Sequence, residues 1–205
     1  MRKLAVVVSS TRPGRAGLPI GRWFHERALA HGRFDVDFVD LLEVGLPFHD
    51  EPKHPRLHQY QHAHTKAWSA RVARTDAFVF VTAEYNSGTP PALANALDFL
   101  HDEWAYKPVG FVSYGGVSAG TRGVQMTKQI VTTLKMMPVL EAVHIPFFAQ
   151  HLDARTGTFR PPEISDEAAS AIVEGDPAVR QGVMRAALFP YRVGLIDEGN
   201  ARREG

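Results

Sequence analysis

The sequence predicts a doubly wound α/β domain built on a parallel sheet. Strand, loop and helix patterns alternate about five times along the chain, which is typical of parallel strands joined by right-handed helical crossovers. Residues 78–81 are apolar throughout, as expected for a strand that is buried on both faces. The 205 residues are enough for one domain with a full core, and no internal repeat divides them.

The N-terminal part supplies two strands and one helix. Residues 4–8 form an apolar strand rich in β-branched side chains, and residues 18–31 have the apolar spacing of a helix that ends at Gly32. Residues 34–39 alternate between apolar and acidic side chains, which favours a strand at the edge of the sheet. A long connection with several prolines follows over residues 41–55.

The middle of the chain continues the alternation. Residues 57–74 are expected to form a helix that leads into the apolar strand. Pro90 and Pro91 preset the backbone for the first turn of the next helix. In order, the expected elements are a strand at 78–81, a helix at 91–100, a strand at 109–113, a helix at 123–136 and a weaker strand at 139–145.

The pattern becomes less regular after Pro146. Short helices are expected at residues 168–173, with Ser165 as the N-cap residue, and at residues 177–188. The chain is therefore interpreted as a single domain over residues 1–205. Its core covers about residues 3–146, and residues 147–205 form an irregular or helical C-terminal extension.

The composition excludes several classes of function. The net charge of +1 gives no general reason to expect a nucleic-acid partner or an anionic membrane surface. The absence of cysteine excludes disulfides and thiolate chemistry. Apolar runs fall well short of the roughly 20 residues that a membrane span needs, so no membrane span is expected and the expected location is cytoplasmic.

Three polar loops follow apolar strands, and they are the candidate ligand site. The first loop covers residues 9–17, the second loop residues 82–89 and the third loop residues 113–120. In an open parallel sheet, ligands bind beyond the carboxyl ends of the central strands. If the three preceding strands are central, all three loops open on one edge, and one ligand could contact them all.

The first loop has the chemistry of a phosphate site. Ser10 supplies a hydroxyl donor, Arg12 and Arg15 supply cationic donors, and Gly17 lets the backbone approach closely. The helix that follows offers unpaired N–H groups and the positive end of its dipole. Neither a P-loop nor a dinucleotide fingerprint is present, so a mononucleotide fits best. The alternative is an ordinary solvated loop with scattered arginines.

The second and third loops suit the remainder of a mononucleotide. Tyr85 and Asn86 lie in the second loop, and the glycines of the third loop leave its backbone N–H groups open to a flat polar heterocycle. A flavin needs donors along its pyrimidine edge and a wall against one face of the ring. The alternative for the third loop is a flexible glycine hinge.

These motifs together resemble the NADPH-dependent FMN reductase family. Residues 9–15 (Ser-Ser-Thr-Arg-Pro-Gly-Arg) are similar to the Gly-Ser-x-Arg opening of that family. Residues 84–86 (Glu-Tyr-Asn) and residues 91–98 resemble its Pro-Glu-Tyr-Asn loop and the helix after it. Residues 113–116 (Ser-Tyr-Gly-Gly), with the Gly120 and Arg122 that follow them, resemble its third flavin loop. The match covers roughly residues 3–145, with all three motifs in order.

The resemblance implies a flavodoxin-like sheet in the order 2-1-3-4-5 and a bound FMN, with NADPH or NADH as co-substrate. It also implies a homodimer or a dimer of dimers with flavin sites near the interface. The first loop would hold the phosphate, the second would line the ring and ribityl chain, and the third would meet the pyrimidine end. The implied cofactor-binding residues are Ser10, Arg12, Arg15, Gly17, Leu18, Ala83, Glu84, Tyr85, Asn86, Ser113, Tyr114, Gly115 and Gly116.

The sequence departs from the family pattern in four places. Ser9 stands where the family has glycine, Ala83 where it has proline, and Ala94 where it commonly has lysine. The region after Pro146 does not follow the family pattern at all, which leaves the assembly and the electron acceptor open.

The chemistry implied by the resemblance is a two-step transfer. Hydride passes from NAD(P)H to FMN, and two electrons then reduce a small-molecule acceptor such as a quinone, a flavin or an azo compound. No catalytic acid or base is assigned, because Glu84 is better interpreted as a carboxylate that positions a loop or a partner subunit. The alternatives are a flavodoxin-like FMN electron carrier and a flavin-free protein that binds another phosphorylated ligand.

A group of histidines raises the possibility of a metal. His58 and His62 have i, i+4 spacing in the expected helix, which can bind zinc. The pattern provides no third ligand, so a solvated helix face or an interface is the preferred interpretation, and no metal site is assigned.

Overall fold

All five expected strands form, and they pair in parallel as one sheet. The computed structural model describes residues 1–174. The sheet order is β2-β1-β3-β4-β5, which confirms the expected flavodoxin-like topology, with the alternating segment at residues 34–39 on an edge. The strands are β1 (Arg2–Val8), β2 (Phe34–Asp40), β3 (Ala77–Ala83), β4 (Pro108–Tyr114) and β5 (Met137–Ile145).

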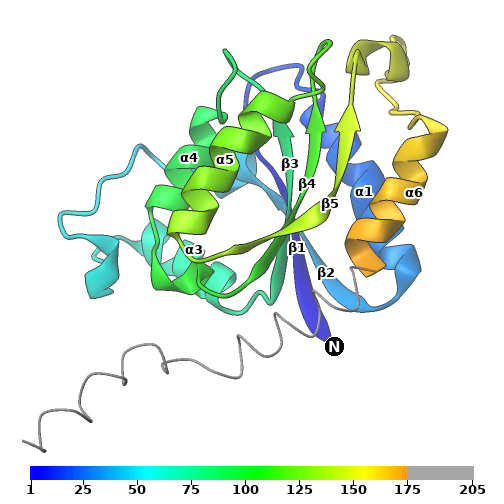
Figure 1. Ribbon diagram of the computed structural model, residues 1–205. Coiled ribbons are helices and arrows are strands. Elements are labelled where there is room, and N and C mark those ends of the chain that lie inside the picture. Colours follow the sequence, from blue (N-terminus) through cyan, green and yellow to red (C-terminus); the bar gives the residue numbers. More distant parts are fainter. Residues whose placement is uncertain (175–205) are drawn as a thin grey trace, which may run out of the picture.

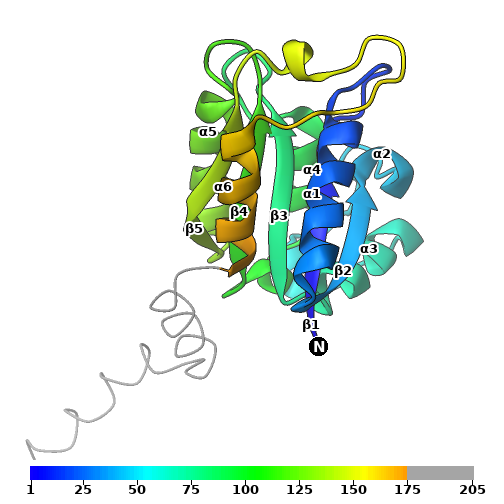
Figure 2. The ribbon, with the colours of Figure 1, turned by 90° about the vertical axis from the view of Figure 1, so that its right-hand side faces the viewer.

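Helices cover both faces of the sheet. Figures 1 and 2 show α1 and α6 on one face and α3, α4 and α5 on the other. No helix among residues 1–174 is both long enough and apolar enough to cross a membrane. The helices are α1 (Gly17–His31), α2 (Leu41–Val44), α3 (Ala63–Ala73), α4 (Pro91–Asp98), α5 (Thr121–Thr133) and α6 (Glu163–Glu174).

The strands alternate their side chains between two cores. In β1, Ala5 and Val7 join the core under α3 and α4, whereas Val6 and Val8 join the core under α1 and α6. All four side chains are at most 2% exposed, because a central parallel strand is covered on both faces. Burial on both faces is why the apolar runs, rather than alternating patterns, marked the central strands.

The region after Pro146 adds a helix to the domain. α6 packs against β5 and α1, and its Ala169 and Val173 are buried in the same core as β1. Gly110 lets α6 lie close to β4 as well, because a Cβ at that position would lie 2.8 Å from Cγ2 of Ile172 in α6. The expected helix at residues 168–173 lies inside α6, while the one at 177–188 lies outside the described residues.

The expected helix at residues 57–74 was wrong at its start. Residues 55–57 form a separate 3₁₀ turn (η1, Pro55–Leu57), His58 adopts a left-handed conformation with φ of 50°, and α3 begins at Ala63. Glu51 accepts the N–H groups of Gln61 and His62 at 2.8–3.1 Å, which satisfies the backbone just before α3. His58 and His62 therefore do not share a helix face.

The connection after β2 begins with a short helix that was not expected from its proline-rich sequence. Asp40 accepts the N–H of Leu42 at 3.0 Å and begins the short helix α2 at the end of β2. Residues 45–62, called here the histidine-rich segment, then run outside the sheet. They include η1 and lead to α3. Within residues 1–174, no group of three or more histidines and acidic residues is placed so that it could hold a metal ion.

Candidate functional site

The three polar loops lie at one end of the sheet, where β1, β3 and β4 finish side by side. Figures 1 and 2 show these connections at the top of the molecule, opposite the N-terminus. The chain order reverses between β1 and β3, and such switch points are where doubly wound sheets bind ligands. The parallel pairing thus brings together loops that are far apart in the sequence.

The start of α1 makes a close contact with the first and third loops, called here the Gly17 cradle. A Cβ built on Gly17 would lie 2.3 Å from Ser10 Oγ and 2.6 Å from Tyr114 Oη. The first loop, the first turn of α1 and the third loop therefore converge on one point. Only glycine allows so close an approach, and Gly17 is the first residue of α1, where helix N–H groups are unpaired.

Several buried polar atoms around this cradle have no hydrogen-bond partner. Among the described residues, Ser9 Oγ, Ser10 Oγ and Arg15 Nε are such atoms. Ser10 lies close enough to Tyr114 to affect its pKa, but no partner meets its hydroxyl with hydrogen-bond geometry. Buried polar groups in proteins are almost always paired, so a cluster of unpaired ones makes this a candidate site for a polar ligand.

The two arginines of the first loop differ in their surroundings. Arg12 is exposed. Arg15 is largely buried and forms an ion pair with the buried carboxylate of Asp40. Both lie close enough to Tyr114 to lower its pKa, but burial dominates and raises the pKa of that phenol to about 12. Tyr114 is therefore a neutral O–H donor at the cradle near pH 7.

Leu18 and Ala83, two further expected contact residues, lie on opposite sides of the switch point. Leu18 is half-buried in the first turn of α1, where a helix has unpaired N–H groups. Ala83 is the buried last residue of β3, and its carbonyl accepts the hydroxyl of Thr82 at 3.0 Å. Both have apolar side chains, so only their backbone offers polar groups at this end of the sheet.

The second loop is a tight turn with a strained backbone. Tyr85 and Gly88 exchange N–H to carbonyl hydrogen bonds of 3.2 and 2.9 Å. Asn86 and Ser87 between them have φ of 51° and 64°, which fits a primed turn but is unusual for residues other than glycine. Such strain is found at binding sites more often than elsewhere.

Glu84 joins the second loop to the third loop and α5. It accepts Arg122 Nε at 2.7 Å, the Arg122 N–H at 3.1 Å and Ser118 Oγ at 3.1 Å. Burial alone would raise the pKa of Glu84, but Arg122 and Ser118 outweigh it and hold the pKa below its usual value. These contacts agree with the interpretation of Glu84 as a positioning carboxylate and leave it poorly suited to act as a base.

His144, which the sequence did not single out, supports the third loop through Ser113. Ser113 Oγ donates to Ala119 O at 2.7 Å and lies 2.6 Å from His144 Nδ1. Because a hydroxyl has only one hydrogen, His144 Nδ1 must be the donor in the second contact. Burial, helped by Lys128, lowers the pKa of His144, so this ring is a neutral Nδ1–H tautomer near pH 7.

The expectation that the third loop leaves all its N–H groups open was wrong at Gly115. Its N–H donates to Ile145 O at 3.2 Å, and its carbonyl accepts the N–H of Phe148 at 3.2 Å. The pairing of β4 with β5 continues beyond the strand ends, which is why this amide is occupied. Gly116 has open space beside its Cα, since a Cβ there would meet nothing within 4 Å, although its carbonyl accepts the N–H groups of Ala119 and Phe147 at 3.1 Å.

Exposed apolar side chains surround the loops. Val117 of the third loop is 81% exposed, Met126 beside Gly88 is 49% exposed, and Phe147, whose N–H donates to Gly116 O, is 51% exposed. They come from three segments that meet at the candidate site. An apolar, planar molecule would find contacts there.

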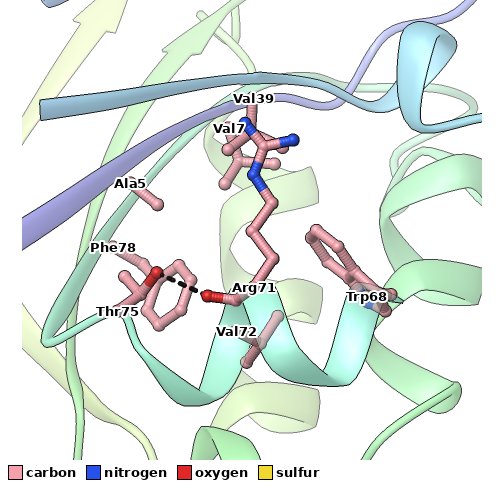
Figure 3. Close-up of a pocket in the computed structure, with 8 residues that line it drawn as sticks. All are labelled: Ala5, Val7, Val39, Trp68, Arg71, Val72, Thr75 and Phe78. Atoms are coloured by element: carbon pink, nitrogen blue, oxygen red, sulfur yellow. Dashed lines mark hydrogen bonds between the residues drawn. The ribbon is translucent and has the colours of Figure 1, made fainter. Parts of the chain in front are cut away.

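A separate small pocket lies away from the loops, among β1, β2 and α3 (Figure 3). Its one cation, Arg71, is bound to Asp37 at 2.7 and 2.9 Å and to Phe38 O at 3.1 Å. The hydroxyl of Thr75 donates to Arg71 O at 3.0 Å. All these polar groups are paired, so this pocket is a packing feature of the core.

Comparisons with known proteins place the chain in a family. The model of a family described as NADPH-dependent FMN reductase matches residues 2–150. An NAD(P)H-dependent FMN reductase of Schizosaccharomyces pombe is 40% identical over 148 residues, which are 70% of this chain and 74% of that one. A second protein of that name, from a Nectria species, is 32% identical over 155 residues, which are 73% of this chain and 77% of that one.

Solved structures show the same fold at lower identity. The flavoenzyme NAD(P)H:(acceptor) oxidoreductase FerB from Paracoccus denitrificans has a TM-score of 0.68 and 18% identity, and the match covers 90% of this chain and 98% of that one. A flavodoxin from Streptococcus pneumoniae has a TM-score of 0.51 at 11% identity, with 87% and 98% of the two chains covered. The sequence matches, which extend over most of the chain, show that this protein belongs to the NADPH-dependent FMN reductase family.

Proposed function

We propose that the protein binds FMN across the three loops and uses it to oxidise NAD(P)H and reduce a small-molecule acceptor. The observation that carries this proposal is the Gly17 cradle, where the buried hydroxyl of Ser10 and Arg15 Nε have no partner within residues 1–174. When bound, the flavin supplies the chemistry: it accepts hydride from NAD(P)H and passes two electrons to the acceptor in a second step.

The first loop fits the FMN phosphate. A phosphate dianion needs several donors at once, and charge-assisted hydrogen bonds are the strongest. Ser10, Tyr114 and the first N–H groups of α1, near Gly17 and Leu18, provide neutral donors. Arg12 provides a positive charge from an exposed position at the same loop. The chain therefore has both the donors and the charge that the group requires.

The second and third loops fit the isoalloxazine ring and the ribityl chain. Tyr85 and Asn86 lie in the strained turn, and Gly116 offers a backbone that no side chain shields. Glu84 and Arg122 fix these loops relative to each other. In this proposal the protein contributes orientation, hydrogen bonds and a wall against one face of the ring, and no side chain acts as an acid or base.

The proposed acceptor is a quinone, a flavin or an azo compound. The apolar rim of Val117, Met126 and Phe147 would suit such planar molecules. A 2-hydroxy-1,4-benzoquinone reductase from a Burkholderia species is 32% identical over 114 residues, which are 56% of this chain and 55% of that one. We further propose that the enzyme works in the cytoplasm as a homodimer or a dimer of dimers, as the family resemblance implies.

A coupled assay tests this proposal. We expect purified protein supplied with FMN to consume NADPH or NADH when a quinone is added, as measured by the loss of nicotinamide absorbance. Retention of FMN without oxidation of either coenzyme, with any of the acceptors, would instead identify a flavodoxin-like electron carrier. If no flavin absorbance stays with the protein after FMN addition, both flavin proposals are wrong.

A further inference from the structure

Asp40 connects the end of β2 to the first loop. It is the last residue of β2, in register with Val8, the residue that precedes the first loop. Its side chain is 2% exposed, and both of its oxygens are occupied. Oδ1 accepts the N–H of Leu42 at 3.0 Å, and Oδ2 accepts Arg15 Nη2. Because both oxygens are occupied, this buried carboxylate holds Arg15 Nη2 and the Leu42 N–H in place.

Arg15 has a second face that Asp40 does not use. Its side chain is 11% exposed, and its Nε is buried without a partner among the described residues. A guanidinium presents its donors in a rigid plane, so binding at Nη2 determines where Nε points. Arg15 lies two residues before Gly17 in the first loop, so its backbone is next to the Gly17 cradle.

The charges argue for a directional role. Because Asp40 neutralises Arg15, the pair adds little net positive charge for an anion, and Arg12 carries the net charge of the loop. Attraction of a phosphate would be stronger if Asp40 were absent. Besides capping α2, the acid thus lowers the charge that the loop offers an anion, which favours a role in orienting Arg15 over a role in attraction.

We propose that Asp40 is a positioning residue, which holds the Arg15 guanidinium so that its unpartnered Nε meets the FMN phosphate. This inference rests on the proposed function, because it assumes that the cradle binds the phosphate of FMN.

Asp40→Asn separates orientation from charge. Asparagine still provides an oxygen to cap α2 at Leu42 but cannot form the ion pair. If orientation dominates, we expect FMN affinity to fall about tenfold. If charge dominates, FMN affinity rises. Flavin fluorescence titrations with FMN and with riboflavin, which lacks the phosphate, measure the effect, and riboflavin affinity should not change.

A second variant keeps the test valid if Asp40→Asn folds poorly. In Arg15→Lys the ammonium can still pair with Asp40 but has no second nitrogen for the phosphate. We expect near-normal thermal stability and an FMN affinity about tenfold lower, again without effect on riboflavin. Arg12→Ala serves as the positive control, and Arg56→Ala, an exposed arginine remote from the loops in the histidine-rich segment, as the negative control.

The outcomes distinguish the inference from the proposed function. If the wild-type protein binds riboflavin as tightly as FMN, the phosphate site itself is wrong. If the wild-type protein prefers FMN but Asp40→Asn and Arg15→Lys bind FMN as tightly or more tightly, the positioning role is overturned and the proposed function stands. Equal losses for FMN and riboflavin would also overturn it, because they would show a general structural defect.

Discussion

The first loop and the histidine-rich segment differ in whether their polar groups are buried and whether they have hydrogen-bond partners. The first loop buries polar atoms such as Ser10 Oγ and Arg15 Nε without giving them partners among residues 1–174. The histidine-rich segment keeps its titratable groups near the surface and pairs them, for example His58 with Asp102 at 3.0 Å. The segment has many more ionisable groups, yet it lacks the features of a binding site.

The pairing in the histidine-rich segment is extensive. His64 Nε2 lies 2.9 Å from Asp50 Oδ1, and Tyr60 donates to Glu103 at 2.8 Å. Hydrogen bonds from His58 and His101 hold the pKa of Asp102 below its usual range. These contacts tie the segment to α3 and η2 (Asp102–Trp104). In this chain, unmet hydrogen-bonding capacity is therefore a better indicator of a candidate site than a high density of ionisable side chains.

Filling the Gly17 cradle should give the largest effect on the first loop. In Gly17→Ala the new Cβ would collide with Ser10 Oγ and the Tyr114 hydroxyl and displace two phosphate donors. We expect FMN affinity to fall about 100-fold, since each hydrogen bond to a charged group contributes roughly 1.5–3 kcal/mol. Riboflavin affinity should fall much less. Fluorescence titration with both flavins measures this.

Gly21→Ala is the matched control, one turn further along α1. Its Cβ would lie 2.5 Å from Val8 Cγ2 in the core, so overpacking should reduce stability by about 1–3 kcal/mol. FMN affinity should stay unchanged in the folded fraction. If Gly17→Ala and Gly21→Ala lower FMN affinity equally, the effect at Gly17 is a general packing defect and the cradle is not the phosphate site.

The sequence predicted the strands and the three loops well for a physical reason. Central strands are continuous apolar runs, and the loops follow them directly, so local patterns located both. Pairings between distant segments, such as Arg15 with Asp40 and Ser113 with His144, leave no periodic signal. The one available clue to Asp40 was that an acidic residue directly follows the strand predicted at residues 34–39. It therefore lies at the same end of the strands as the first loop, which has two arginines.

The errors have the same origin. The start of α3 was misplaced because Glu51, ten residues before Gln61, accepts the backbone N–H groups that precede the helix. Gly115 was expected to be open, but its N–H pairs with Ile145 because the β4–β5 ladder continues into the third loop. Both depend on contacts that only the folded chain creates.

Breaking the ion pair between Glu84 and Arg122, called here the Glu84 clamp, should lower flavin affinity by less than Gly17→Ala. The loss should not depend on the phosphate of FMN. Glu84→Gln removes the charged contact to Arg122, whose side chain is 60% exposed, so solvent weakens the loss to about 1 kcal/mol. We expect affinity to fall about fivefold for FMN and riboflavin alike, because in the proposed function Glu84 and Arg122 fix the parts of these loops that contact the ring rather than the phosphate. Titration with both flavins distinguishes this from a first-loop variant.

Arg122→Gln is the partner control, because it breaks the same clamp from the other side. The double variant should lose no more affinity than either single variant, since contacting residues are not additive. A loss confined to FMN would contradict the division of roles between the loops. It would place Glu84 in the phosphate site instead.

The smallest effect is expected in the histidine-rich segment, where Glu51→Gln should alter stability and leave flavin binding intact. Burial disfavours the charged form of Glu51, but the N–H groups of Gln61 and His62 outweigh it and lower the pKa to about 2 from 4.5. The lowered pKa means that the carboxylate stabilises the fold fully above pH 4.5 and loses this contribution as pH falls towards 2.

Urea unfolding of the wild type and Glu51→Gln measures the contribution. Near neutral pH the difference in unfolding free energy should be about 1 kcal/mol or less, because solvent screens an accessible carboxylate. In acid the difference should shrink, since the wild-type carboxylate is then protonated and also loses its charge. An unchanged FMN affinity would keep the two regions distinct. A clear loss of FMN affinity in Glu51→Gln would show that the segment shapes the site, and the contrast between paired and unpaired polar groups would then not separate scaffold from site.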